Sequence, residues 1–202
     1  MIVRWTNAEI CAKLLAKEKR GVFMEEFCVD IKGLTAKLPV LQIAPKVKIA
    51  FFNLHGDTVT TEHCGKELAK LADGCEVLIT AESKGLQLTH VVARELGMQY
   101  YAVARKSQKL YMQDGISVAY GASITTGKSQ ELHLSKHDAD LLKGKKVGIV
   151  DDVISTGESL KGLEKLVEKA GGTVYKKLFV LAEGAAKDRK DALYLASIPL
   201  FE

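Results

Sequence analysis

The sequence predicts an α/β fold with a parallel-sheet core and flanking helices. Short apolar runs alternate with stretches of helical periodicity along most of the chain. Polar, glycine-containing turns separate these segments, and two of the turns directly follow apolar runs. Strand–helix–strand units of this spacing pair in parallel, with right-handed crossovers. The 202 residues are enough for one domain with a sizeable core.

Helix signals mark several segments of the chain. Thr6 and Glu9 form a capping box ahead of an apolar stripe, and Asp57 is placed to cap another helix. Gly97 and Gly171 close two further helical stretches. The expected helices are residues 6–20, 57–71, 85–97 and 157–170.

Strands are expected where apolar residues run together or alternate. The run CEVLITA has the length and composition of a buried strand, and the run KKVGIVDD ends in two acids. The expected strands are residues 22–31, 38–52, 75–81, 99–105, 145–152 and 173–184. Residues 107–130 form a long polar connection between two core strands, and such connections are typical of functional lids or of disorder.

Composition limits the function without deciding it. The chain is 47% hydrophobic and 27% charged, and its net charge of +4 fits an anionic small ligand as well as weak nucleic-acid contact. No two of its four cysteines form a C-x-x-C pair, and its five histidines show no metal-ligand spacing. The opening stretch lacks the apolar segment of a signal peptide, and no apolar run reaches membrane-spanning length. We expect a cytoplasmic protein without membrane contact.

Two polar loops stand where predicted strands end, which is where parallel sheets bind ligands. The first is AESKG at residues 81–85, and the second is DDVISTGES at residues 151–159. In the second loop, Ser155, Thr156 and Ser159 supply hydroxyls, and Gly157 lets backbone N–H groups approach an anion at a helix N-terminus. This loop therefore predicts a phosphate site.

Two adjacent carboxylates, Asp151 and Asp152, precede that phosphate site. Carboxylates repel a phosphate but accept hydrogen bonds from hydroxyl groups, each worth roughly 1.5–3 kcal/mol. A ribose 5-phosphate satisfies both halves of the loop, and Glu158 then has to point away from the phosphate. The simpler interpretation is a solvated turn with a helix cap, but the apolar run, the acid pair and the Ser-Thr-Gly spacing occur together.

The segment VGIVDDVISTGES resembles the signature of the type I phosphoribosyltransferases. AESKG is similar to the pyrophosphate loop of the adenine phosphoribosyltransferases, with Lys84 in place of their usual arginine. AVARKSQKL resembles their strand that ends in Arg-Lys before a flexible loop, and the tail from LFVLAEG to IPLFE is also similar. The resemblance covers most of the chain from about residue 57, and it is closest to the adenine enzymes.

This resemblance implies one phosphoribosyltransferase domain over residues 1–202, with a core over about 57–182 and a hood from 1–56 and 183–202. The implied reaction transfers ribose 5-phosphate from phosphoribosyl pyrophosphate (PRPP) to a purine, adenine first, and releases pyrophosphate. Mg²⁺ is the implied cofactor, held mainly by PRPP, with Asp151 or Asp152 reaching it through water. PRPP and a purine base are the expected partners in a homodimer, and no nucleic acid is expected.

The resemblance also implies the roles of individual residues. The implied catalytic residues are Asp151, Asp152, Lys84 and Arg105. The implied PRPP-binding residues are Glu82, Ser83, Lys84, Gly85, Arg105, Lys106, Lys109, Asp151, Asp152, Ser155, Thr156, Gly157, Glu158 and Ser159. The cationic members would meet the pyrophosphate, and residues 107–130 would close over the site and exclude water.

Two functional alternatives stay open. Thr125 stands where the adenine enzymes carry a loop glutamate, and the segment ARKSQKLYMQDGISVAYGASIT also resembles the xanthine enzymes. Xanthine or another oxopurine is therefore a rival base. A non-catalytic regulator could keep the PRPP site as a sensor, although such regulators usually add a DNA-binding winged helix, for which residues 1–56 are too short.

A P-loop is the structural alternative. Residues 122–129, ASITTGKS, fit the loose phosphate-loop pattern of nucleotide-binding proteins. A true P-loop follows a strand and opens a helix, whereas Leu132 and Leu134 alternate like a strand here. Only SKHDADLL offers a short helix before the next strand.

Overall fold

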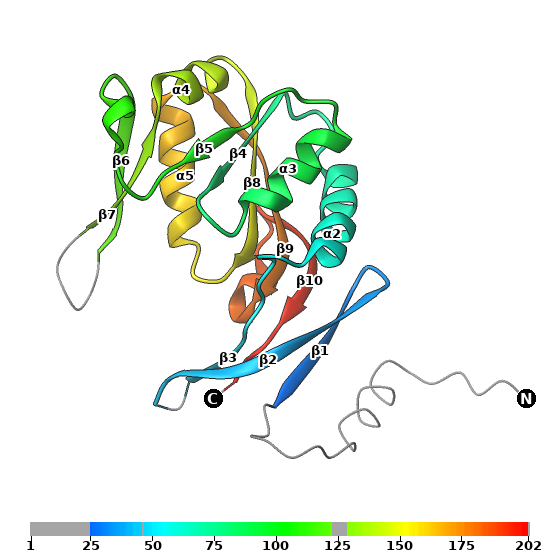
Figure 1. Cartoon of the computed structure of the whole chain (residues 1–202). Helices are drawn as coiled ribbons and strands as arrows, with labels where there is room; N and C mark the ends of the chain where they lie inside the picture. The colour runs from blue at the N-terminus through cyan, green and yellow to red at the C-terminus, as the bar shows by residue number, and fades with distance from the viewer. Residues whose placement is uncertain (1–24, 46, 123–128, 202) are drawn as a thin grey trace, which may run out of the picture.

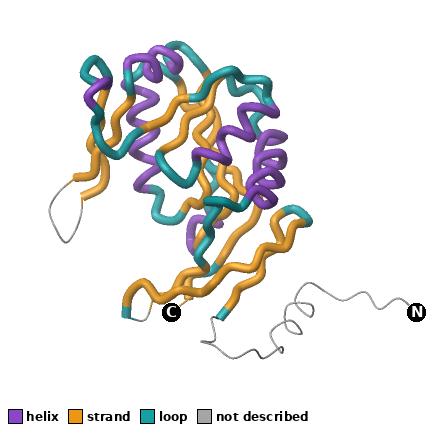
Figure 2. Tube along the Cα trace, viewed as in Figure 1, coloured by secondary structure: helices purple, strands orange, loops and turns teal. Residues whose placement is uncertain are grey.

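The core of the molecule is a five-stranded sheet in which all neighbouring strands are parallel (Figures 1 and 2). The computed structural model describes residues 25–45, 47–122 and 129–201, so the predicted helix at 6–20 lies outside the described residues. The sheet order is β10-β9-β8-β4-β5. The strands are β4 (Val77–Ala81), β5 (Ala102–Ala104), β8 (Lys146–Ile154), β9 (Thr173–Glu183) and β10 (Leu193–Ile198). The predicted α/β class with a parallel-sheet core is confirmed.

Helices cover both faces of this sheet (Figure 1). The helices are α2 (Thr58–Leu71) and α3 (Leu86–Glu95) on one face, and α4 (Lys136–Leu142) and α5 (Glu158–Lys169) on the other. Val150 of β8 belongs to the core under α2 and α3, and its neighbour Ile149 belongs to the core under α5. β4 is buried at every position, as expected of a strand with neighbours on both edges and helices on both faces.

The predicted cap of α2 is present. The Asp57 carboxylate accepts a hydrogen bond from the Thr60 N–H at 2.9 Å, which satisfies one of the free N–H groups of the first turn. α3 and α5 also lie close to their predicted bounds. The short helix expected in SKHDADLL is α4, which begins after Ser135; that hydroxyl accepts from the Asp138 N–H at 3.1 Å.

A four-stranded antiparallel sheet forms the hood beyond one end of the core (Figure 1). Its strands are β1 (Glu26–Ile31), β2 (Leu34–Ala44), β3 (Val47–Ala50) and β11 (Leu200–Phe201), in that order. The single strand predicted over 38–52 is two strands, β2 and β3, which turn at Pro45 and pair with each other. A proline cannot donate to a strand ladder, so it favours this break.

The chain segment after 183 divides between the two sheets. β10 pairs in parallel with β9, and it buries Leu195 and Ile198 in the same core as α2. This pairing corrects the expectation that all of 183–202 joins the hood. Only β11 pairs with β3 of the hood, where Phe201 meets Phe27 edge-to-face at a ring distance of 5.6 Å.

A two-stranded hairpin projects from the α5 side of the core (Figure 1). It consists of β6 (Ile116–Ala122) and β7 (Ser129–Leu134), and the short turn η1 (Leu110–Met112) precedes it. The predicted strand through Leu132 and Leu134 is therefore confirmed, and the P-loop alternative is wrong because a strand rather than a helix follows residue 129. The predicted lid spans this hairpin, but its residues 123–128 lie outside the described residues, so the lid stays a prediction.

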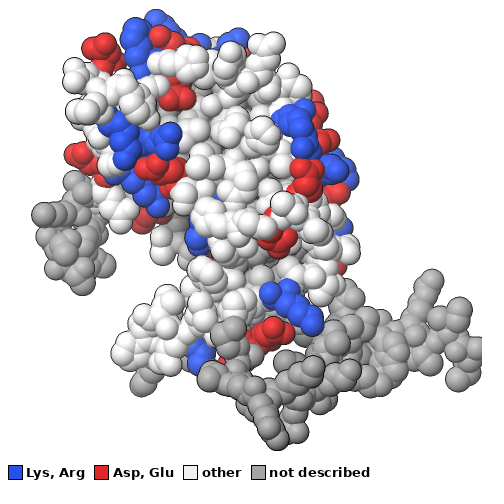
Figure 3. Space-filling view, in the orientation of Figure 1, with Lys and Arg blue, Asp and Glu red and all other residues white. Residues whose placement is uncertain are grey.

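Charged side chains on the viewed face lie mainly over the outer helices and the hairpin, with both signs intermixed (Figure 3). Lys165 and Lys169 of α5 donate to the backbone carbonyls of Ala119 and Ser117 in β6, which fastens the hairpin to the helix. On the other side, Arg94 of α3 forms a two-pronged ion pair with Glu62 of α2. Among the described residues, no helix is long and apolar enough to cross a membrane.

Candidate active site

Three loops meet at the carboxyl edge of the parallel sheet, and they follow three neighbouring strands. β8 leads into residues 155–159, β4 into residues 82–85, and β5 into residues 105 and 106. A cavity of about 380 Å³ lies between these loops. Eight predicted site residues line it: Glu82, Ser83, Lys84, Lys106, Asp151, Asp152, Ser155 and Ser159. The fold thus brings together residues that lie more than 70 positions apart in the sequence.

The two acids belong to the last part of β8, and both line this cavity. Burial, and after it the charge of Asp152, raises the pKa of Asp151 to about 7. Burial also raises the pKa of Asp152. The Asp152 Oδ1 accepts from the Val153 N–H at 2.9 Å, while its buried Oδ2 has no hydrogen-bond partner in the described part of the chain. An unpaired buried carboxylate oxygen is costly, so this atom is a strong acceptor for a ligand hydroxyl.

The predicted phosphate loop forms the turn from β8 into α5. Gly157 stands at the N-cap of α5 with a φ of +81°, a conformation that L side chains rarely adopt. A second cavity of about 150 Å³ is lined by residues of this loop, which include Ser155, Thr156 and Gly157. Glu158 also borders this cavity, but its carboxylate is paired with Lys161 at 2.7 Å. The loop and helix N-terminus therefore have the form expected of an anion site.

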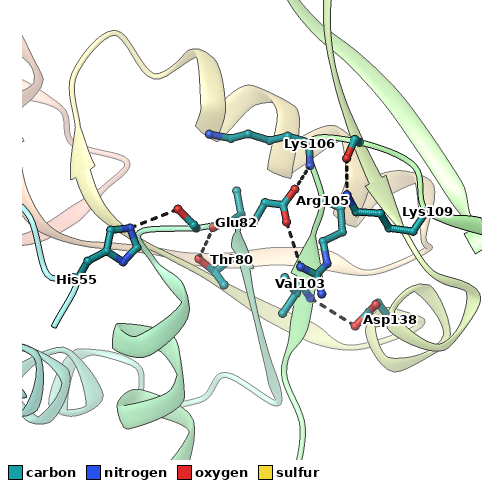
Figure 4. A network of polar contacts seen from close by, with 11 residues as sticks. His55, Thr80, Glu82, Val103, Arg105, Lys106, Lys109 and Asp138 are labelled. Atoms are coloured by element: carbon teal, nitrogen blue, oxygen red, sulfur yellow. Dashed lines mark hydrogen bonds and ion pairs between the residues drawn. The ribbon is translucent and has the colours of Figure 1, made fainter. Parts of the chain in front are cut away.

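Glu82 in the β4 loop is directed at the neighbouring β5 loop (Figure 4). Its carboxylate accepts from the Arg105 guanidinium at 3.0 Å and from the Lys106 N–H at 2.7 Å. Partial burial opposes ionisation, but these two donors and their charge hold the pKa of Glu82 below its usual range. Glu82 thus joins the second and third loops.

Lys84 and Gly85 bring the β4 loop against the acids. The Lys84 Nζ lies 3.9 Å from the Asp152 Oδ2 and 4.9 Å from the centre of the Phe51 ring. A Cβ atom at Gly85 would collide with the Thr80 hydroxyl and would lie 3.0 Å from the Asp151 Oδ1. Only glycine lets the two loops approach this closely.

Besides Gly85, two predicted residues line neither cavity. Arg105 contacts Glu82, and its backbone pairs with that of His133 at the base of the hairpin. Lys109 donates to the Ser107 hydroxyl at 2.8 Å. Neither side chain lines the cavity of about 380 Å³ or the one of about 150 Å³. Arg105 supports the site through Glu82 in this conformation.

Comparison with known proteins agrees with this geometry. Residues 64–198 match the phosphoribosyl transferase domain. The chain is also 33% identical over 157 residues to the xanthine phosphoribosyltransferase of Bacillus cereus (strain B4264), an alignment that covers 74% of this chain and 77% of that protein. The chain belongs to the phosphoribosyltransferase family.

Solved adenine phosphoribosyltransferases share the fold of this phosphoribosyltransferase. The enzyme from Thermoanaerobacter pseudethanolicus matches with a TM-score of 0.64 and 25% identity, over 80% of this chain and 95% of that one. The enzyme from Giardia lamblia, solved with 9-deazaadenine, matches with a TM-score of 0.64 and 20% identity, over 80% of this chain and 93% of that one. The resemblance to type I phosphoribosyltransferases is confirmed.

Two residues at this candidate site of the phosphoribosyltransferase were not predicted from the sequence. Tyr120 of β6 lines the main cavity, and its hydroxyl donates to Gln130 of β7 at 2.8 Å. His55, which lies between β3 and α2, contacts the Ser83 hydroxyl through Nε2 at 3.3 Å. A lone tyrosine in an alternating strand and a histidine without ligand spacing carry no local signal of these contacts.

Proposed function

We propose that this phosphoribosyltransferase transfers the 5-phosphoribosyl group of PRPP to a ring nitrogen of a purine base and releases pyrophosphate. The observation that carries the proposal is Asp152, which lines the cavity between the phosphate loop and the Lys84 loop and whose buried Oδ2 is unpaired within the described residues. A ligand with sugar hydroxyls between two anionic groups matches this arrangement. The carboxylates can accept from the hydroxyls, and the N–H groups of the phosphate loop and the lysines of the other two loops can each meet an anionic group. The enzyme class follows from the family.

In the proposed reaction, the C1–O bond of PRPP breaks and positive charge grows on the ribose ring. Asp151 and Asp152 orient the hydroxyls and stabilise this charge through space, and Lys84 and Lys106 meet the charge of the departing pyrophosphate. The electron pair of the broken bond leaves with the pyrophosphate oxygen, and the base nitrogen forms the new bond to C1 while its proton is released to the solvent. Catalysis here consists mainly of positioning and electrostatic stabilisation.

Magnesium fits this chemistry as a partner of PRPP. Within the described residues, no group of three or more His, Cys, Asp or Glu side chains could hold a metal ion by itself. The Asp152 Oδ2 and the nearby Asp151 carboxylate would therefore reach the ion through water while PRPP oxygens supply most ligands. When bound, Mg²⁺ neutralises pyrophosphate charge.

Adenine is the base that we propose. The solved adenine enzyme from Thermoanaerobacter pseudethanolicus matches 80% of this chain at 25% identity, and the tail of the chain also resembles the adenine enzymes. Xanthine is the second candidate, because the curated relatives at 33% identity are xanthine enzymes. Adenine presents a donor at C6 where oxopurines present an acceptor, and one mismatched buried polar group costs roughly 1–3 kcal/mol. Thr125, the residue that departs from the adenine pattern, lies outside the described residues.

A base screen tests the proposal. Purified protein with PRPP and Mg²⁺ receives adenine, xanthine, hypoxanthine or guanine, and pyrophosphate release is measured. We expect kcat/KM for adenine to exceed that for each oxopurine by more than about tenfold. A preference for xanthine would transfer the substrate assignment to the second candidate. PRPP binding without turnover of any base would replace the catalytic proposal by the sensor alternative.

A further inference from the structure

The phosphate loop contains no cation of its own. Residues 151–159 include three acids, Asp151, Asp152 and Glu158, and neither lysine nor arginine. Lys161, one turn into α5, is paired with Glu158. A 5-phosphate bound at this loop would therefore rely on N–H groups and hydroxyls alone, unless a more distant segment contributes positive charge.

Arg189, which ends the short helix η2 (Gly184–Asp188), lies against this loop. A Cβ atom built on Gly157 would be 3.1 Å from the Arg189 Nη1 and 3.8 Å from its Cζ. The guanidinium therefore occupies the space beside Gly157 that a side chain would otherwise fill. Gly157 thus allows both the positive φ of the turn and the close approach of Arg189.

The orientation of the guanidinium is fixed from its other edge. The Arg189 Nε and Nη2 donate to the two carboxylate oxygens of Asp191 at 3.0 and 2.7 Å. Asp191 also accepts from Lys177 at 2.8 Å, and Lys177 is paired with Glu164 of α5. Hydrogen bonds from Arg189, and next from Lys177, hold the pKa of Asp191 well below its usual range, so this carboxylate stays ionised.

The remaining nitrogen is the one nearest the loop. In a planar guanidinium, a carboxylate held by Nε and Nη2 leaves Nη1 on the opposite edge. Among the described residues, Nη1 of Arg189 donates no hydrogen bond, and the side chain is 30% exposed. The free N–H groups of Arg189 thus face Gly157, and the Asp191 carboxylate lies on the opposite edge of the guanidinium.

We infer that Arg189 is a positioning residue that supplies the positive charge for the 5-phosphate of the ligand through the Gly157 turn. Asp191 and Lys177 hold it in place, and its charge supports phosphate binding at a loop whose own residues carry negative charge. The inference rests on the proposed function, because it takes residues 155–159 as the phosphate site. It adds a charge from a segment that the sequence motif does not include.

The test compares two ligands that occupy different halves of the proposed site. The variants are Arg189→Met, which keeps much of the side-chain volume without the charge, Arg189→Lys, and the control Lys190→Met at the exposed neighbouring residue. Affinities for ribose 5-phosphate and for magnesium pyrophosphate are measured by calorimetry. We expect Arg189→Met to weaken ribose 5-phosphate about tenfold and pyrophosphate less than about twofold. Arg189→Lys should recover part of the loss, and Lys190→Met should change neither affinity.

A purely structural role predicts a different pattern. If Arg189 only packed against the loop, Arg189→Lys and Arg189→Met would lose the same affinity for ribose 5-phosphate. That result would overturn the inference, and so would an unchanged ribose 5-phosphate affinity in Arg189→Met. The unmodified protein provides a test that does not depend on folding of a variant. Ribose 5-phosphate should slow labelling of Arg189 by phenylglyoxal, read by peptide mass spectrometry, and pyrophosphate should not. Equal labelling with and without ribose 5-phosphate would also refute it. If the unmodified protein binds no ribose 5-phosphate, the proposed function itself fails.

Discussion

The Lys84 Nζ lies 3.9 Å from the Oδ2 of Asp152, too far for a hydrogen bond although near enough for charge attraction. These residues come from loops after two adjacent strands, β4 and β8. The lysine lowers the cost of burying the carboxylate without occupying its acceptor site. Within the described residues, this buried oxygen therefore keeps an unused acceptor site.

Removing both acids should abolish most of the activity. Asp151→Asn with Asp152→Asn keeps the side-chain shapes, but it removes the charges that orient the ribose and oppose its growing positive charge. We expect kcat/KM to fall on the order of 10²-fold or more. Asp140→Asn, which removes an exposed acid paired with Lys136, is the matched control. Near-normal turnover in the double variant would contradict the assigned role.

The stability of the ligand-free protein should fall as pH rises from about 5 to 7.5. Because the pKa of Asp151 is raised to about 7, the folded protein keeps a proton that the unfolded chain has released in this window. For one proton, the free energy of unfolding cannot fall by more than about 1.4 kcal/mol per pH unit. Urea unfolding at several pH values measures this fall in the free energy of unfolding, and the Asp151→Asn substitution should remove the fall. An equally steep fall in that variant would assign the effect to another group.

The positive charge of Lys84 should contribute to binding of the pyrophosphate group of PRPP. Lys84→Met would leave the Asp152 Oδ2 without its nearby cation and would remove the contact with the Phe51 ring. We expect the KM for PRPP to rise about tenfold or more, because a charge-assisted contact is lost. Lys84→Arg, the residue usual at this position in the adenine enzymes, should retain most of the affinity. A KM that is unchanged in Lys84→Met would place pyrophosphate elsewhere.

Gly162 should be required for the packing of the hairpin against α5. An added Cβ would lie 2.8 Å from the Tyr120 ring, which is buried against the helix. Gly162→Ala should therefore destabilise the protein by about 1–3 kcal/mol through overpacking. The same change should cost clearly less in a Tyr120→Ala background, and the double-mutant cycle measures the difference. Additive effects would show that Tyr120 is not the residue that Gly162 accommodates.

The active species should be a homodimer. The segment that follows Arg105 and Lys106 exposes two large apolar side chains, Leu110 and Tyr111, at 91% and 71%, and a partner chain could cover them. Sedimentation should give twice the mass of one chain, and Leu110→Asp with Tyr111→Asp should dissociate the pair and lower activity. Ile43→Asp, an exposed apolar position in β2, is the control. A fully active monomer would refute this prediction.

The sequence predicted the positions of those candidate-site residues that depend on local pattern. Asp151 and Asp152 could be placed because the apolar run of β8 leads directly to them, and Gly157 because it opens α5. Contacts made across long separations were not predictable. Glu82 bonds to a backbone N–H that is 24 residues away, and Tyr120 reaches the cavity from the hairpin. The pairing of β10 with β9 instead of the hood likewise depends on the final packing of the core.

Under the proposed function, the pairing of β8 with β4 fixes the distance between the two loops that bind the two ends of the substrate. The phosphate loop extends from one strand and the Lys84 loop from the next, and hydrogen-bonded strands lie about 4.8 Å apart. The span between the two loops is therefore set largely by the sheet and little by any single side chain. The hood strands belong to a different sheet, so under the proposed function we expect substitutions there to change the choice of base while the length of sugar phosphate that fits stays the same.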